Sequence, residues 1–169
     1  MFANRISQTL HDEHRATIAL MERLEAAISR RQPISIADSA GARLLADLAA
    51  AIEADTLRHF DFEETQLFTM FDSVGDQLIG DHLTEEHSFM RPLGEKLIAL
   101  ARAAQTGGFD AESWREFSRS GAELVQRMVV HVQKEEMALL PLLDQTMDDA
   151  TEARLYDAYA RASQGAEAT

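Results

Sequence analysis

His59-Phe-Asp-Phe-Glu63-Glu64-Thr-Gln-Leu67 is a stretch that recurs, 72 residues later, as His131-Val-Gln-Lys-Glu135-Glu136-Met-Ala-Leu139. In each copy a histidine precedes a glutamate by four residues, so on a helix the two side chains lie on one face, one turn apart. Such a pair can reach one metal ion, or one ion and its neighbour. Two pairs in matching apolar settings predict a metal site that is built twice.

The remaining histidines extend the repeat. His14 follows Glu13, and His87 follows Glu86 at an offset of 73 residues. The chain therefore reads as His, His-x-x-x-Glu, His, His-x-x-x-Glu. This order indicates a duplicated helix pair.

Length and composition are those of a globular protein. The chain has 169 residues, 46% of them hydrophobic and 27% charged, which predicts one domain over residues 1–169 with a proper core. We expect the bundle over about 7–149, followed by a short helix and a tail over 151–169. There is no cysteine, so any metal must be held by imidazole and carboxylate groups, which suits iron, manganese or zinc.

The net charge and the hydropathy of the chain limit which partners the protein can have. A net charge of −13 argues against nucleic acid or anionic lipid as a direct partner, and its simplest explanation is a solvated acidic surface. The first residues lack the apolar run of a signal peptide, and no 18-residue apolar stretch could span a membrane. We therefore expect a cytoplasmic protein, either a monomer or a homodimer.

The apolar residues recur with helical spacing, and strand-like alternation is nowhere sustained. This pattern predicts an all-α fold, an up-down-up-down four-helix bundle with a short fifth helix at the C-terminus. Gly107-Gly108 is expected to stop the third helix. The expected helices are 7–31, 38–72, 81–105, a fourth from about 110, and 151–163.

Individual residues mark the other expected boundaries. Gly75 and Gly80 are predicted to bracket the turn between the second and third helices. Asp110 and Thr151 are the expected N-caps of the last two helices. Pro141 is expected to kink the fourth helix or to end it.

The four histidines of the repeat each fall on the apolar stripe of a different expected helix. Burying four imidazoles and two carboxylates at one level of a core is costly unless metal ions satisfy them. If both glutamates bridge, each of two metals receives two nitrogens and two oxygens, and an oxo or hydroxo bridge adds a fifth donor. One position per metal then remains for a small ligand. The candidate ligands are His14, His59, Glu63, His87, His131 and Glu135.

Four further residues have open roles. His11 lies one turn from His14 and is either an additional ligand or a group just outside the ligand set. His82 is either a ligand or a surface residue, because Leu83 takes the inward position. Glu64 and Glu136 are offset from the inward stripe, as surface residues or as groups that orient a ligand histidine.

Four motifs follow one another along the chain: Leu10-His-Asp-Glu-His14, His59-x-x-x-Glu63-Glu64-x-x-Leu67-Phe68, Glu85-Glu86-His87, and His131-x-x-x-Glu135-Glu136-x-x-Leu139-Leu140-Pro141. In this combination the chain resembles the hemerythrin-like (HHE cation-binding) domains over about residues 7–145. The resemblance implies a four-helix bundle with a non-haem diiron centre. It also implies that the six candidate ligands hold the iron.

Two departures separate the chain from the oxygen-carrying hemerythrins, which use His-x-x-x-His on the third helix and His-x-x-x-x-Asp on the fourth. Position 83 is Leu, and His131 pairs with Glu135. The pattern is closer to the bacterial His, His-x-x-x-Glu, His, His-x-x-x-Glu branch, whose members are linked to peroxide decomposition, nitric oxide handling, oxygen sensing and iron–sulfur repair. The lack of cysteine disfavours iron–sulfur repair, and the carboxylate-rich site disfavours reversible oxygen transport.

The resulting hypothesis is a non-haem diiron protein that binds or reduces a small oxidant such as peroxide, dioxygen or nitric oxide, in redox stress defence. As an enzyme it would be a catalase-like peroxidase or a nitric-oxide-reducing oxidoreductase. One competing hypothesis is a sensor of oxygen, nitric oxide or redox state that acts through a separate protein partner. The other is a store or carrier of iron.

Overall fold

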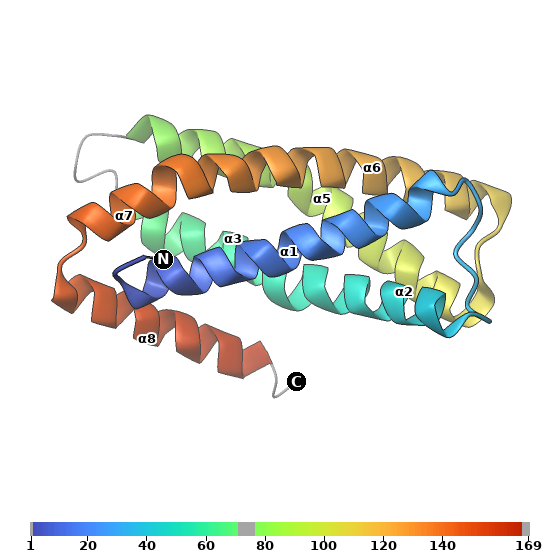
Figure 1. The fold of residues 1–169 in the computed structure, drawn as a ribbon, viewed down its shortest axis with the longest axis horizontal. Coiled ribbons are helices and arrows are strands. Elements are labelled where there is room, and N and C mark those ends of the chain that lie inside the picture. The colour runs from blue at the N-terminus through green and yellow to red at the C-terminus, as the bar shows by residue number, and fades with distance from the viewer. Residues whose placement is uncertain (1, 71–76, 167–169) are drawn as a thin grey trace.

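In a computed structural model the chain forms four long helical columns with a further helix packed along one side (Figure 1). The structure describes residues 2–70 and 77–166, and these contain no strand. Three π-helical turns interrupt the columns: η1 (Ile52–Thr56), η2 (Glu63–Leu67) and η3 (Glu135–Leu139). The α-helices are α1 (Arg5–Ser29), α2 (Ser39–Ala51), α3 (Leu57–Phe62), α5 (Gln77–Gly107), α6 (Ala111–Lys134), α7 (Leu140–Thr146) and α8 (Asp149–Ala166).

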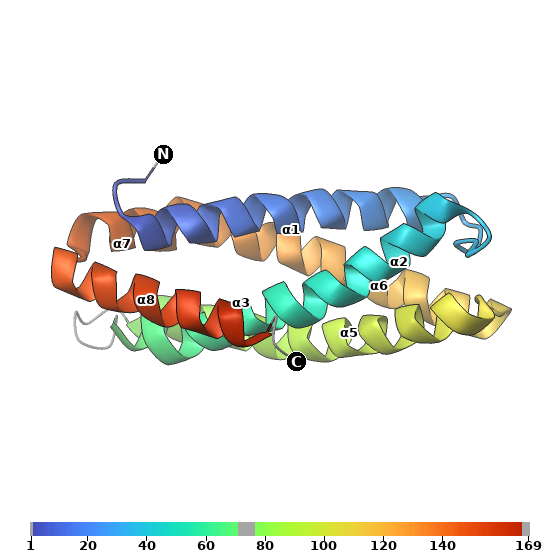
Figure 2. The ribbon, with the colours of Figure 1, turned by 90° about the horizontal axis from the view of Figure 1, so that it is seen from below.

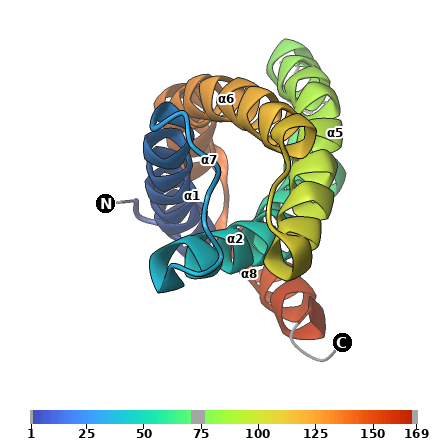
Figure 3. The same ribbon diagram turned by 90° about the vertical axis from the view of Figure 1, so that its right-hand side faces the viewer.

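The four columns form a closed ring when viewed along the bundle, in the order α1, α2, α5, α6 (Figure 3). The second column continues from α2 through η1, α3 and η2, and the fourth continues from α6 through η3 and α7. Consecutive columns are neighbours and run in opposite directions, so the predicted up-down-up-down bundle is confirmed. The fifth helix, α8, lies outside the ring beside the first half of α1 (Figure 2).

Side-chain caps and one glycine set several helix ends as predicted. The Asp110 carboxylate accepts the backbone N–H groups of Glu112 and Ser113, which caps the start of α6. Asp38, at the expected start of the second helix, accepts the backbone N–H of Ala40 and caps α2. Gly108 follows α5 with a φ of 71°, a conformation that suits glycine at a helix end.

Two predicted boundaries are wrong. Gly80 lies inside α5 and not in a turn, at a place where a Cβ would be only 3.2 Å from the Phe68 Cβ, a tight contact that glycine avoids. Thr151 does not cap α8. The cap is Asp148, whose carboxylate accepts the Thr151 backbone N–H at 2.8 Å. The predicted turn residue Gly75 lies outside the described residues.

Two of the π-helical turns begin at equivalent positions of the sequence repeat. In η2 the Glu63 carbonyl accepts the N–H of Phe68, and in η3 the Glu135 carbonyl accepts the N–H of Leu140. Such turns are frequently found at functional sites, because they shift a side chain relative to a regular helix. Pro141 does not end the fourth column. It follows η3 and lies in the first turn of α7, where a missing N–H is tolerated.

Two apolar clusters fill the inside of the bundle on either side of a polar layer. The larger cluster includes Met21, Leu45, Leu97 and Phe117. The smaller includes Leu10 of α1 and extends to Leu155 and Tyr159 of α8. This packing explains why α8 stays against the bundle. None of the helices that the structure describes combines the length and apolar character that crossing a bilayer requires.

Candidate metal centre

Six polar side chains form a buried layer between the two apolar clusters, and each is at most 6% exposed. All four columns contribute to it. The donor atoms fall into two groups, within each of which they lie no more than 4.8 Å apart. The first position consists of His14, His59, Glu63 and Glu135, and the second position consists of His87, His131, Glu63 and Glu135.

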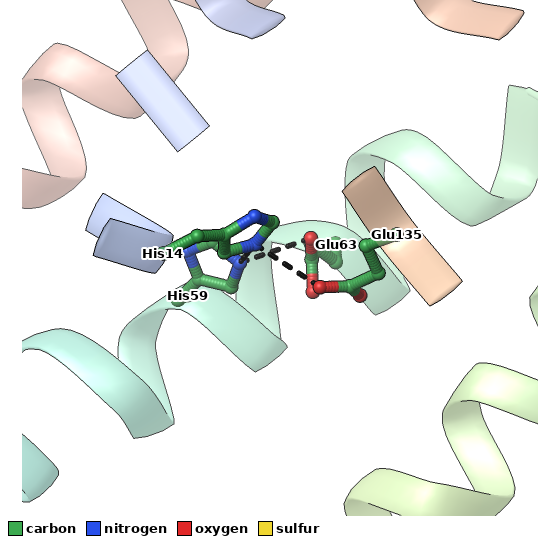
Figure 4. A group of neighbouring side chains, drawn as sticks. All are labelled: His14, His59, Glu63 and Glu135. Atoms are coloured by element: carbon green, nitrogen blue, oxygen red, sulfur yellow. Dashed lines mark hydrogen bonds and ion pairs between the residues drawn. The ribbon is translucent and has the colours of Figure 1, made fainter. Parts of the chain in front are cut away.

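The first position brings together donors from the first, second and fourth columns (Figure 4). The Nε2 atoms of His14 and His59 are 3.3 Å apart. Oε1 of Glu63 is 3.0 Å from Nε2 of His59, and Oε2 of Glu135 is 3.1 Å from Nε2 of His14. Two donors that bind one ion at about 2.1 Å and at right angles are about 3 Å apart. The spacing therefore suits a single ion among these four side chains.

The second position repeats this arrangement with the other oxygens of the same two glutamates. The Nε2 atoms of His87 and His131 are 2.9 Å apart. Oε1 of Glu135 is 3.1 Å from Nε2 of His131, and Oε2 of Glu63 is 3.6 Å from Nε2 of His87. Each glutamate thus presents one oxygen to each position, as a carboxylate that bridges two metal ions would do.

The two shared glutamates provide a test of whether this layer suits metal ions. Glu63 and Glu135 are fully buried, and none of their four carboxylate oxygens has a hydrogen-bond partner among the described residues. Imidazole nitrogens lie 3.0–3.6 Å away, but none of these contacts is a hydrogen bond. Buried carboxylates without partners are costly. Cations at the two positions would balance both charges, so the residues present fit a pair of metal ions.

Four further glutamates hold the histidines from outside. Because each Nδ1–H donates to a carboxylate, Nε2 of the neutral ring presents its lone pair to the centre of the layer. All four contacts join different helical columns of the ring. The Nδ1 contacts are His14 to Glu136 (2.7 Å), His59 to Glu13 (3.0 Å), His87 to Glu64 (2.8 Å) and His131 to Glu86 (2.9 Å).

The electrostatics of the layer also favour a cation. Burial and the charge of Glu135 raise the pKa of the Glu63 carboxyl. Burial opposes the charged form of His14, but the neighbouring carboxylates of Glu135 and Glu136 outweigh it and raise the pKa of His14 to about 9. Burial and the neighbouring charge of His131 lower the pKa of His87 to about 2. Without metal ions, protons are thus distributed unevenly among the carboxylates and imidazoles of the layer. Metal ions would let both carboxylates ionise and leave the imidazoles neutral.

The structure places each residue whose role the sequence left open. Glu64 and Glu136 contact histidines, which agrees with the orienting role and not with a plain surface role. His11 lies outside both positions and contacts Oε2 of Glu136 through Nδ1 at 2.8 Å. His82 also lies outside them, with its side chain 56% exposed and Nε2 3.3 Å from Glu86.

The glutamates that contact the histidines from outside, together with their own partners, form an outer layer. Three of its residues were not assigned a role from the sequence. Glu13 and Glu86 precede His14 and His87 directly, and this repeated Glu-His pair was the available signal. The third residue is Tyr159 of α8, whose hydroxyl donates to Oε2 of Glu13. Tyr159 follows the second copy of the repeat, so the repeat carried no signal for it.

Inside the four-helix bundle, four imidazoles converge with two carboxylates that have no hydrogen-bond partner among the described residues. This arrangement is typical of a helical protein that binds cations. The family model for the hemerythrin HHE cation binding domain matches residues 5–143 and, in an overlapping match, residues 78–167. The chain therefore belongs to the hemerythrin HHE cation-binding domain family, as its motifs predicted. No curated protein and no solved structure matches the chain.

Proposed function

We propose that the protein is a non-haem diiron protein that binds or reduces a small oxidant such as peroxide, dioxygen or nitric oxide. The observation that supports this proposal best is the pair of buried glutamates, Glu63 and Glu135, that both metal positions share. One iron would be held by His14 and His59, the other by His87 and His131, and both by the two glutamates. When bound, two irons would supply reversible one-electron chemistry between the ferrous and ferric states.

A small cavity beside the first position supports a ligand of only a few atoms. Its volume is about 20 Å³, enough for about one water-sized molecule. Thr17 and Val132 line it. Across the repeat, Thr17 corresponds to Met90 and Val132 to Phe60, whose ring stacks on His87 with centroids 3.8 Å apart. The smaller residues leave space at the first position that the larger ones fill at the second.

The apolar surroundings support redox chemistry that is kept apart from bulk water. Phe60 and Met128 come from the larger apolar cluster, and both also line the small cavity. The four outer glutamates fix the imidazole rings, so the donor set is organised before any ion binds. In such a site the protein selects for small molecules, because larger ones do not fit the cavity.

Elemental analysis and peroxide turnover test this proposal together. Protein purified without chelator, or reconstituted with ferrous iron under anaerobic conditions, is expected to hold two irons per chain. Added peroxide is expected to evolve oxygen over many turnovers. One ion per chain, or none, would contradict the dinuclear site, and two manganese or zinc ions would contradict iron. A Glu123→Ala variant, which alters an exposed pair with Arg127, serves as the control and should behave as the wild type.

A sensor is a second candidate, and one observation favours it. Tyr159 connects α8 to His59 through Glu13, so a change at the first position could alter how α8 packs. A sensor should show one spectral change on oxidation without turnover, together with altered hydrogen exchange in α8. Unchanged exchange in α8 between the reduced and oxidised forms would contradict this candidate.

A further inference from the structure

We propose that the two metal positions are inequivalent, and that the first position binds its ion more tightly because both outer glutamates of the second position are paired with cations, whereas only one is at the first position. The inference rests on the proposed dinuclear site, and it adds an order of loading and the residues that set it. The cations are Lys134 and Arg91.

Both outer glutamates of the second position contact a positively charged group. The ammonium group of Lys134 contacts Oε1 of Glu86, whose Oε2 contacts Nδ1 of His131. The guanidinium group of Arg91 is 3.0 Å from the oxygen of Glu64 that also contacts Nδ1 of His87. Each histidine of this position is therefore separated from a cation by one carboxylate.

The outer glutamates of the first position have different partners. Glu13 accepts the hydroxyl of Tyr159 on the same oxygen that contacts His59. Glu136 contacts His11, a side chain without a permanent charge, at 2.8 Å. Glu13 also pairs with the guanidinium group of Arg58, which is 3.5 Å from its other oxygen, so one outer glutamate of the first position contacts a cation whereas both do at the second position. A hydroxyl and an imidazole thus occupy the places that an ammonium and a guanidinium group occupy at the second position.

The repeat shows that this difference is built into the sequence. At the position equivalent to Lys134 the first half has Phe62, and at the position equivalent to Arg91 it has Ile18. Phe62 is buried and packs edge-on against Tyr159, with ring centroids 4.6 Å apart. The residue that replaces the lysine therefore holds the tyrosine that supplies a neutral donor instead.

Two physical effects act in the same direction. Two fixed cations near the second position repel an incoming divalent ion more than the single cation near the first position does, and solvent screens this repulsion only in part because the side chains of Arg91 and Lys134 are 26% and 39% exposed. A carboxylate that is already paired with a cation also attracts the Nδ1 proton less strongly. The imidazole is then less electron-rich at Nε2 and binds a metal ion more weakly. Arg91 also contacts Asp61 at 2.9 Å, but Asp61 is 69% exposed and solvent weakens that pairing.

Loading with a single equivalent of metal tests the order. Cobalt(II) is added at one equivalent to the metal-free, full-length chain, which is then crystallised, and anomalous peak heights are compared at the two positions. The peak between His14 and His59 is expected to be the higher by about tenfold. Equal peaks, or a higher peak between His87 and His131, would overturn the inference. A wild-type chain that binds no cobalt(II) at either position would instead overturn the proposed function on which the inference rests.

A charge-removing variant tests the assigned cause. Lys134→Gln keeps a donor for Glu86 and removes the charge, so the ratio of the two stepwise cobalt(II) constants should fall by about tenfold. Lys96→Gln is the matched control, because Lys96 forms an equivalent pair with Glu116 between the same two helices but away from the layer. If both variants keep the wild-type ratio, Lys134 does not set the difference.

Discussion

Tyr159 of α8 and His59 of α3 meet on one oxygen atom, Oε2 of Glu13, which both contact. Tyr159 is only 3% exposed, and Glu13 lies in α1. One carboxylate therefore joins the last helix, the first helix and the second column. The fifth helix thereby has a direct contact with the outer layer of the candidate metal centre, in addition to its apolar packing.

Replacing Tyr159 by Phe is expected to destabilise the fold. The variant keeps the buried ring but removes a hydrogen bond to a carboxylate, a loss of about 1.5–3 kcal/mol in the free energy of unfolding. Urea unfolding of the metal-free protein measures this change. Tyr156→Phe is the control, because that ring stays under the guanidinium group of Arg5 at 4.4 Å. Equal effects of the two substitutions would contradict a specific role for the Tyr159 hydroxyl.

A second contact fixes α8 to the start of α1 and makes its docking sensitive to acid. A hydrogen bond from the Arg5 side chain lowers the pKa of Glu152 below its ordinary value of 4.5. A lowered pKa in the folded state means that this stabilisation is fully present above about pH 4.5 and is lost as the pH falls through the folded value. Arg5→Gln should raise the Glu152 pKa in a carboxyl NMR titration, and an unchanged pKa would refute the assignment.

Glu63→Gln should have opposite effects on the metal-free and metal-loaded protein. In metal-free protein the substitution removes a buried charge beside Glu135, so the melting temperature should rise by about 2–4 °C for each 1 kcal/mol gained. With metal present, the stabilisation that ions give the wild type should be reduced or lost. Calorimetry with and without metal measures both effects, with the exposed Glu123→Gln as control. Full metal-induced stabilisation in Glu63→Gln would argue against a bridging role.

Glu64→Gln is expected to weaken metal binding without removing a ligand. The amide contacts Nδ1 of His87 less favourably than the carboxylate does, and loss of such an outer partner typically lowers metal affinity about 10–100-fold. Competition with a chelator of known affinity provides the measurement. Glu85→Gln changes an exposed glutamate of α5 and should leave the affinity unaltered. Equal affinities for the two variants would exclude the orienting role.

Two helical glycines should respond differently to alanine. A Cβ on Gly121 would lie 3.5–3.7 Å from Leu24, an ordinary contact, so Gly121→Ala should stabilise α6 by about 0.5–1 kcal/mol. A Cβ on Gly94 would lie 2.9 Å from Cγ2 of the fully buried Ile52, so Gly94→Ala should give no gain or a loss. Thermal unfolding of both variants checks this packing, and a stabilised Gly94→Ala variant would show that Ile52 can move aside.

Much of the fold followed from local patterns in the sequence. Helical spacing placed the columns to within a few residues, because an amphipathic stripe and its caps are properties of neighbouring residues. The exceptions are instructive. Gly80 resembles a turn residue in sequence, but it lies in α5, where a Cβ would be only 3.2 Å from the Phe68 Cβ and glycine avoids this tight contact. The π-helical turns at Glu63 and Glu135 were not predicted either, since the same sequence spacing fits a regular helix.

The six residues of the buried layer were also selected from sequence alone. His59 with Glu63, and His131 with Glu135, must share a helix face whatever the tertiary packing, because four residues make about one helical turn. His14 and His87 were added by the repeat. The six residues assemble in two groups that share both glutamates because the apolar stripes of all four columns face the same interior.

The outer layer was decided by tertiary structure. Which glutamate meets which histidine depends on the rotation and axial stagger of neighbouring columns, and no local spacing encodes either. The pairing of His59 with Glu13 and of His131 with Glu86 thus emerged only from the packed bundle. The sequence by itself determined an inner set of donors that is nearly symmetric. The packing of Tyr159 and Lys134 against their glutamates made the two halves different, because the partners of a half-buried carboxylate are fixed by the helices that pack around it.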